Sequence, residues 1–135
     1  MLPAMLVLAG AACSASDPVP SPIFDGQYAG TRRSDQTEAC GVAKLEGTTT
    51  ARIARGRLSM GLFGGKTQLT GTVGEDGRVR ASGIWANPTG GFPGMTVLDG
   101  QISGKTLNGT ATDFRCHTDI RLQRVASPHG PGVRP

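Results

Sequence analysis

The stretch Phe114-Arg-Cys-His-Thr-Asp-Ile-Arg-Leu122 carries the clearest structural signal in the chain. With Asp113 before it, its side chains alternate between two faces. The mostly apolar face has Phe114, Cys116, Thr118, Ile120 and Leu122, and the mostly charged face has Asp113, Arg115, His117, Asp119 and Arg121. Because successive side chains of a β-strand point to opposite faces, this alternation predicts a strand with one face in a core and the other in water. We expect this strand to span 114–125.

The composition of the whole chain also favours β-structure. Its 135 residues include 21 glycines, 37% hydrophobic and 18% charged residues, and the formal net charge is +4. The charged fraction is too low for a solvated disordered chain, and the glycines follow no three-residue period. Glycine and threonine are poor helix formers, which excludes a long coiled coil. The composition therefore indicates one small all-β domain.

Four short glycine-containing sequences divide the chain into strands. Arg55-Gly56, Gly64-Gly65, Asp76-Gly77 and Gly104-Lys105 are typical of tight hairpin turns, in which glycine takes a positive φ. The predicted strands are 23–32, 48–55, 57–63, 67–74, 78–86, 95–102, 106–112 and 114–125. The sequence thus predicts an all-β fold that is a small antiparallel meander of about eight strands.

A short phrase with glycine at its centre occurs in four places. It reads Phe24-Asp-Gly-Gln-Tyr28, Leu69-Thr-Gly-Thr-Val73, Leu98-Asp-Gly-Gln-Ile102 and Leu107-Asn-Gly-Thr-Ala111. The glycine shares a strand face with the two apolar residues around it, which indicates a sharp bend or a close backbone approach. Strongly coiled strands of a small barrel need such positions.

Two cysteines lie near the two ends of the predicted meander. Cys40 follows the first strand and Cys116 belongs to the last, so a disulfide between them would join the two ends of the meander. A closed sheet, whose first and last strands pair, brings such cysteines together. We therefore predict a Cys40–Cys116 disulfide and favour a closed up-and-down barrel over an open sandwich.

The first residues of the chain are typical of an export signal. Residues 1–16 are uncharged and contain an apolar run from Met5 to Ala12, which is too short to cross a membrane as a helix. Gly10-Ala11-Ala12-Cys13 is similar to the lipobox of bacterial lipoproteins, in which the cysteine is lipidated. We expect either ordinary signal cleavage or a lipid on Cys13, and a buried first strand or helix is the alternative.

These features set the expected domain limits and location. The proline-rich residues 17–22 are expected to be an extended spacer, 23–125 the barrel domain and 126–135 a disordered tail. We expect a periplasmic or secreted protein, or one anchored to the outer membrane by the lipid.

The opening F-D-G-Q-Y-A-G-T at 24–31, the D-G-R-V at 76–79 and the closing C-x-x-x-I-x-L at 116–122 resemble a group of short exported bacterial proteins of unassigned function. The expected barrel is also similar in outline to avidin-like and lipocalin-like binders and to periplasmic metalloprotease inhibitors. The resemblance implies a small exported barrel and transfers no catalytic residue. Avidin-like pockets are rich in tryptophan, whereas Trp85 is the single tryptophan here, so a biotin-type site is not expected.

Candidates for catalysis are few. His117 with Asp113 and Asp119 is the one cluster that resembles a catalytic or metal site, and Arg115 and Arg121 between the carboxylates would repel a cation. The sequence contains no Gly-x-Ser-x-Gly elbow, Cys-x-x-Cys pair, His-Glu-x-x-His motif or phosphate loop. We expect a protein that is not an enzyme and uses no cofactor or metal, and a hydrolase that uses His117 is the alternative.

Arginines provide a first candidate binding site. Arg52, Arg55 and Arg57 flank one predicted hairpin turn. In a bacterial envelope their partner would be anionic lipid, lipopolysaccharide or an acidic protein surface. Nucleic acid is disfavoured by location and because no aromatic residues lie among the arginines. Charge that only maintains solubility is the alternative.

The loop 87–94 provides a second candidate site. It carries Phe92 beside prolines, and Trp85 lies just before it. Trp85 and Phe92 would form a contact surface at the mouth of the barrel, or alternatively a lid that fills its end. Taken together, the sequence predicts an exported binding or envelope-structural module, with a periplasmic protease-inhibitor-like protein as the alternative.

Overall fold

The computed structural model describes residues 16–40, 42–62, 67–85, 94–113 and 116–125. Within these ranges the chain forms one short 3-10 helix and eight strands. They are η2 (Pro22–Phe24), β1 (Gly26–Ser34), β2 (Glu46–Ala54), β3 (Arg57–Leu62), β4 (Thr67–Val73), β5 (Arg78–Trp85), β6 (Gly94–Ser103), β7 (Thr106–Thr112) and β8 (His117–Val125).

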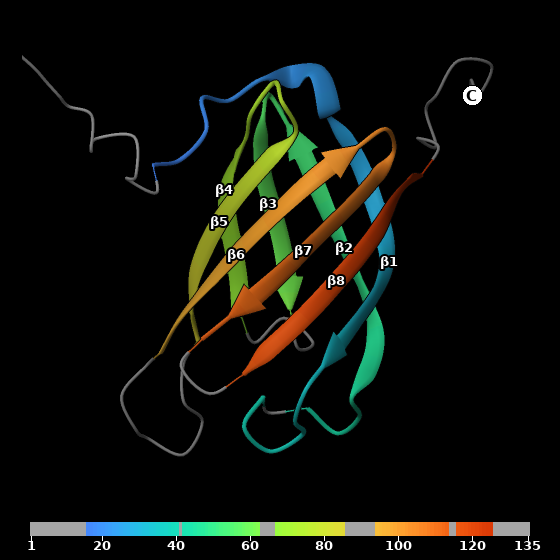
Figure 1. The fold of residues 1–135 in the computed structure, drawn as a ribbon, viewed down its shortest axis with the longest axis vertical. Helices are drawn as coiled ribbons and strands as arrows, with labels where there is room; N and C mark the ends of the chain where they lie inside the picture. The colour runs from blue at the N-terminus through green and yellow to red at the C-terminus, as the bar shows by residue number, and fades with distance from the viewer. Residues whose placement is uncertain (1–15, 41, 63–66, 86–93, 114–115, 126–135) are drawn as a thin grey trace, which may run out of the picture.

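The sheet closes on itself. Each strand pairs antiparallel with the next one along the chain, and β8 pairs with β1 (Figure 1). The closing seam runs from Gln27 opposite Val125 to Ser34 opposite Thr118. The predicted meander and the closed up-and-down barrel are therefore confirmed, and the open sandwich is excluded.

The two ends of the barrel differ. We call the end with η2 and the β2–β3, β4–β5 and β6–β7 turns the hairpin end, and it lies at the top of Figure 1. The opposite end, which we call the disulfide end, carries the predicted bond between Cys40 and Cys116, with their Cα atoms 5.1 Å apart. The bond closes a loop with a sequence separation of 76 residues, which in the chain-entropy picture stabilises the fold by about 4 kcal/mol.

Two strands begin later than the sequence pattern predicts. The expected first strand began at residue 23, but Pro22–Phe24 forms η2, whose Pro22 carbonyl accepts a hydrogen bond from the Asp25 N–H. The expected last strand began at residue 114, but β8 starts at His117. Asp113 and Cys116 close a turn before it, because the Cys116 N–H donates to the Asp113 carboxylate at 2.8 Å. Local turns at proline and aspartate thus shorten both strands.

The segment before η2, expected to be an extended spacer, lies against the hairpin end. The Ser21 N–H donates to the Val73 carbonyl at 2.9 Å. Gly56 approaches the same segment so closely that a Cβ atom on it would lie 2.3 Å from the Ser21 nitrogen. Residues 16–22 therefore cross this end in contact with the β2–β3 and β4–β5 turns.

The interior is apolar over most of its length and includes more hydroxyl side chains toward the disulfide end. Toward the hairpin end and the middle the core consists of fully or almost fully buried apolar side chains: Tyr28, Ile53, Leu58, Met60, Leu69, Val73, Val79, Leu98, Ile102, Leu107, Ile120 and Leu122. Toward the disulfide end the buried positions are mixed: Leu62 and the two disulfide cysteines lie there together with five hydroxyl residues, Ser34, Thr49, Thr67, Thr96 and Thr118. The predicted inward face of β8 is confirmed for its described members, while Phe114 lies outside the described residues.

The expected close backbone approach at strand glycines is confirmed most clearly at Gly71. A Cβ atom on Gly71 would lie 2.0 Å from the Arg80 carbonyl oxygen of the neighbouring strand, a contact that real atoms do not make. The turn glycines also behave as predicted, because Gly56, Gly77 and Gly104 all have positive φ. Gly64 and Gly65 lie outside the described residues.

Candidate functional site

Outward side chains of four neighbouring strands align in two rows across the barrel wall. The strand register places Thr31, Arg121, Asn108 and Gln101 opposite one another from β1 through β8 and β7 to β6. We call these four residues the donor row. The same register aligns Arg33, Asp119, Thr110 and Asp99, which we call the charged row. The rows lie two residues apart along each strand, so their side chains share the outer face.

Each charged side chain of the charged row has a described partner, which is an opposite charge for Arg33 and Asp99 and a hydroxyl for Asp119. Arg33 forms an ion pair with Glu46 of β2, and Arg80 of β5 donates to Asp99 at 3.1 Å. Between them, the Thr110 hydroxyl donates to the Asp119 carboxylate at 3.0 Å. These contacts are largely exposed, so each contributes at most about 1 kcal/mol to stability. The ion pairs compensate the charges of Arg33 and Asp99, whereas Asp119 keeps its negative charge.

The donor row differs from the charged row because most of its side chains have no described partner. Among the described residues, the side chains of Thr31, Arg121 and Asn108 have no hydrogen-bond or ion-pair partner. Gln101 at the end of the row donates to the Asp76 and Ile102 carbonyls. The exposed guanidinium of Arg121 therefore lies between two uncharged polar side chains with its donors unused.

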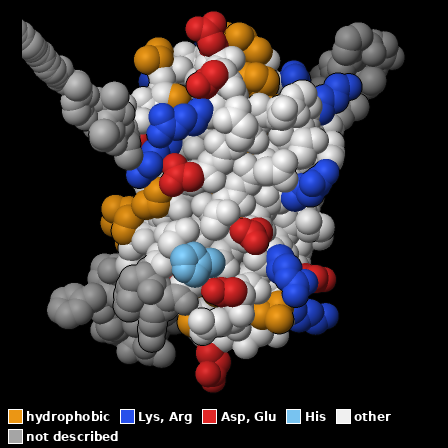
Figure 2. Space-filling view, in the orientation of Figure 1, with side chains coloured by type: hydrophobic (Ala, Val, Ile, Leu, Met, Phe, Trp, Pro, Cys, Tyr) orange, Lys and Arg blue, Asp and Glu red, His pale blue; other side chains and the backbone are white. Residues whose placement is uncertain are grey.

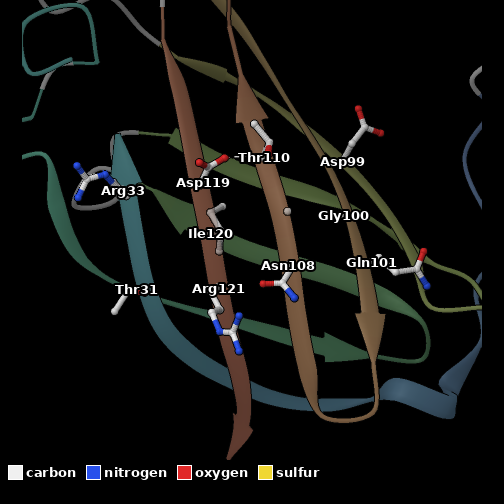
Figure 3. Close-up of a pocket in the computed structure, with 11 residues that line it drawn as sticks. Thr31, Arg33, Asp99, Gly100, Gln101, Asn108, Thr110, Asp119, Ile120 and Arg121 are labelled. Carbon is white, nitrogen blue, oxygen red and sulfur yellow. Dashed lines mark hydrogen bonds between the residues drawn. The ribbon is translucent and has the colours of Figure 1, made fainter. Parts of the chain in front are cut away.

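A groove of about 580 Å³ runs over these rows on the outside of the barrel (Figure 3). Its floor includes the backbone at Gly100 and Gly109, which face each other across β6 and β7, and Ile120 beside them. Figure 3 shows Arg121 and Asn108 near each other on one side of this floor and Asp119 turned toward Thr110. In Figure 2 the middle of this face is mostly uncharged, with several Asp and Glu side chains on it and Lys and Arg side chains at both of its edges.

The three arginines predicted to bind a partner meet at the hairpin end. Arg52 on β2 pairs with Ser59 of β3, and Arg57 lies two residues before Ser59. Arg52 and Arg57 are therefore diagonal neighbours, with Cα atoms about 7–8 Å apart. Arg55 occupies the turn with a φ of 55°. The Asp25 carboxylate accepts hydrogen bonds from the backbone N–H groups of Arg55 and Gly56, which fixes the turn. None of these three guanidinium groups has a carboxylate partner among the described residues.

The cluster around His117 does not assemble into a site within the described part of the chain. The Asp119 carboxylate accepts from Thr110, and the Asp113 carboxylate accepts from the Cys116 backbone. The exposed His117 donates its backbone N–H to Asp35 at 3.2 Å. No described contact joins the His117 side chain to either carboxylate, so the arrangement shows no catalytic pair.

One group of possible metal ligands occurs among the described residues, and the sequence analysis did not single it out. Asp35, Cys40 and Cys116 have their ligand atoms within 4.8 Å of one another. Both sulfur atoms belong to the disulfide, and a disulfide sulfur is not the thiolate that binds a metal. The group is therefore part of the closing turn and not a metal site.

Other predicted positions lie partly or wholly outside the described residues. The backbone of Trp85 pairs with Thr67 and Gly94 at the disulfide end. The side chain of Trp85, Phe92 with its loop, and Cys13 are outside the described residues, so their roles stay predictions.

Two buried hydroxyls near Trp85 in the register were missed by the sequence analysis. Thr67 is fully buried and Thr96 is 2% exposed, and neither hydroxyl has a hydrogen-bond partner among the described residues. An unsatisfied buried hydroxyl costs about 1–3 kcal/mol. By contrast, Thr49 donates to the Gly61 carbonyl at 2.8 Å. The threonine content of the strands was visible in the sequence, but the missing partners were not.

Tyr28 is the one described group with a clearly shifted pKa. Burial raises the pKa of its phenol above 10.0, while the positive charge of Arg124 lowers it and the negative charge of Asp25 raises it further. The phenol donates to the Phe24 carbonyl at 2.7 Å inside the hairpin end. This tyrosine is therefore a structural residue that holds η2 against the core.

No helix in the described part of the chain is long and apolar enough to span a bilayer. Comparisons with protein-family models, with curated proteins and with solved structures each found no match.

Proposed function

We propose that the protein is an exported, non-catalytic binding module that attaches to an anionic surface of the bacterial envelope through Arg52, Arg55 and Arg57, the hairpin arginines. The observation that carries the proposal is their lack of a carboxylate partner among the described residues, whereas Arg33 and Arg80 have one. Basic side chains near an anionic lipid surface contribute about 1 kcal/mol each.

The surroundings of the hairpin arginines support this surface. Arg124, at the end of β8, lies over Gly26 of β1. Gly26 pairs with Ile53 of β2, so Arg124 adds a fourth positive charge beside the hairpin. Glu75 and Asp76 occupy the neighbouring β4–β5 turn. The contact with an anionic surface would therefore run along the β2–β3 side of the hairpin end.

The course of the N-terminal segment also supports an orientation with the hairpin end toward a membrane. Residues 16–22 cross this end, and Val19 and Ile23 expose 81% and 57% of their surface there. Exposed apolar side chains next to arginines suit the interface of a bilayer. Cys13 precedes Ser16 by three residues, so a lipid on Cys13 would lie within about 11 Å of Ser16.

Export and the absence of catalysis remain part of the proposal. Export is supported by the signal-like residues 1–16 and by the disulfide, which is typical of oxidising compartments. The non-catalytic role is supported by the separate contacts of His117, Asp113 and Asp119.

The test uses the chain from Ser16 onward, which contains every described residue and has no lipid or leader. Cosedimentation with phosphatidylcholine vesicles, with and without phosphatidylglycerol, should show binding only to the anionic vesicles, and added salt should weaken it. Equal binding to both kinds of vesicle, or to neither, would contradict the proposal. Binding to a protease instead of the vesicles would favour the inhibitor-like alternative.

A further inference from the structure

We propose that Arg121, with Thr31 and Asn108 on either side, binds the oxyanion of a small polar ligand, a carboxylate in the first place, in the groove on the β6–β7–β8–β1 wall. This site is on a different part of the barrel from the hairpin arginines and does not depend on their function.

The register is the first argument for the site. Thr31 lies directly opposite Arg121 on one side, and Asn108 lies directly opposite it on the other. Side chains in such cross-strand pairs have Cβ atoms about 4.5–5.5 Å apart. The guanidinium, the amide and the hydroxyl can thus donate to one group from three neighbouring strands. A planar oxyanion with several lone pairs is the ligand that such a set of donors complements.

The unused donors are the second argument. In the charged row every charge has a described partner, but the side chains of Arg121, Asn108 and Thr31 have none. Asp119 lies two residues from Arg121 on the same strand face, about 6–7 Å along the strand, and its carboxylate accepts from Thr110 instead. Arg121 is therefore a positive charge with no direct ion-pair partner among the described residues.

The rest of the groove limits the size and charge of the ligand. Asp119 lies in the charged row next to Arg121, and its only described partner is the neutral Thr110 hydroxyl, so its negative charge would repel a second negative charge on the ligand. The floor is backbone at Gly100 and Gly109, with polar Thr110 and Gln101 around it. At about 580 Å³ the groove is in the size range of small-molecule sites. It suits a monoanion with a neutral body that carries hydroxyl or amide groups.

The experiment is a titration of the isotope-labelled full chain, followed by NMR, with three probes. N-acetylglycine carries the carboxylate, N-acetylglycinamide is its neutral counterpart, and inorganic phosphate offers an oxyanion without the body. We expect N-acetylglycine to shift the Arg121 side-chain N–H signal and the backbone signals of Thr31 and Asn108. The neutral amide should leave them unchanged. A larger shift with phosphate would support the oxyanion site and assign it to phosphate-bearing ligands.

Two variants make the result specific. Arg121→Gln should weaken binding of N-acetylglycine by about tenfold or more, because it removes the charge and the paired donors. Arg52→Gln removes the same charge from the hairpin and should leave the titration unchanged. Absence of shifts in the parent chain, equal shifts with the neutral amide, or undiminished binding by Arg121→Gln would overturn the proposal. Arg121 is exposed, so Arg121→Gln should not disturb the fold. The spectrum of the variant without ligand checks this directly.

Discussion

Ser34 Oγ and Thr118 Oγ1 lie 2.9 Å apart across the seam where β1 meets β8, and a buried hydrogen bond joins these residues, 84 positions apart in the chain. The Thr118 hydroxyl is also 3.4 Å from the Cys116 sulfur, next to the disulfide. The closure of the barrel thus combines backbone pairing along the seam with the disulfide and with side-chain hydrogen bonds, Ser34 to Thr118 and His117 to Asp35, at the disulfide end.

This relationship predicts coupling between the two hydroxyl residues. Ser34→Ala should lower the free energy of unfolding by about 1–2 kcal/mol, because the buried Thr118 hydroxyl loses its partner. In the Ser34→Ala/Thr118→Val double variant both hydroxyls are gone, so the loss should be smaller than the sum of the two single losses. Urea unfolding of the four proteins measures this coupling. Strictly additive losses would mean that the hydrogen bond does not contribute to closure.

Much of the fold could be predicted from the sequence because its signals are local. The signals are turn glycines such as Gly77, the alternation of β8 and the positions of Cys40 and Cys116. Each of them depends on a few neighbouring residues or on order along the chain. These signals were sufficient for the strand order, the closed barrel and the disulfide. The strand starts at Gly26 and His117 were missed because short turns compete with the strand pattern there.

The donor row could not be predicted in this way. Thr31, Asn108 and Arg121 are ordinary outward residues in three separate strands, and only the register places them side by side. Register depends on how every strand pair packs its core face, so a shift of two residues would keep the alternation and separate the three side chains. The hairpin arginines, by contrast, lie within six residues of sequence and were identified from it.

Thr67 and Thr96, whose buried hydroxyls have no partner among the described residues, predict an unusual gain in stability. Thr67→Val and Thr96→Val replace a buried hydroxyl that lacks a described partner with a methyl group of similar shape, so each should stabilise the protein by about 1 kcal/mol. Thr49→Val is the matched control, since it removes a hydroxyl that donates to Gly61, and it should destabilise by about the same amount. If Thr67→Val and Thr96→Val are as destabilising as the control, both hydroxyls have partners in solution.

The glycine at the tightest strand contact should tolerate no side chain. Gly71→Ala would place a Cβ atom 2.0 Å from the Arg80 carbonyl oxygen, so we expect a loss of about 3 kcal/mol or more in unfolding free energy, or failure to fold. Gly104→Asn is the control, because that turn position has a φ of 63° and open space around it, and asparagine accepts this conformation. Thermal unfolding compares the two variants, and similar melting temperatures would mean that the strands are not this close.

The buried phenol predicts how stability depends on alkaline pH. Burial raises the pKa of Tyr28 above 10.0, so the folded state holds the phenol proton more tightly than the unfolded state does. The contribution of this group to stability is complete below pH 10 and is lost as the pH rises toward the folded-state pKa. In Tyr28→Phe this alkaline loss should be reduced, at a cost of about 1 kcal/mol at neutral pH for the missing hydrogen bond to Phe24. Identical alkaline profiles for both proteins would show that another group controls the transition.

Two matched double variants distinguish binding through the hairpin arginines from an effect of net charge. Arg52→Gln/Arg57→Gln and Arg33→Gln/Arg80→Gln each remove two positive charges, but among the described residues only the second pair has carboxylate partners. The measurement is the affinity of the chain from Ser16 onward for phosphatidylglycerol-containing vesicles. We expect a loss of affinity of about tenfold or more for Arg52→Gln/Arg57→Gln and a much smaller change for Arg33→Gln/Arg80→Gln. Equal losses in the two variants would contradict binding through the hairpin arginines, because net charge alone would then explain the binding.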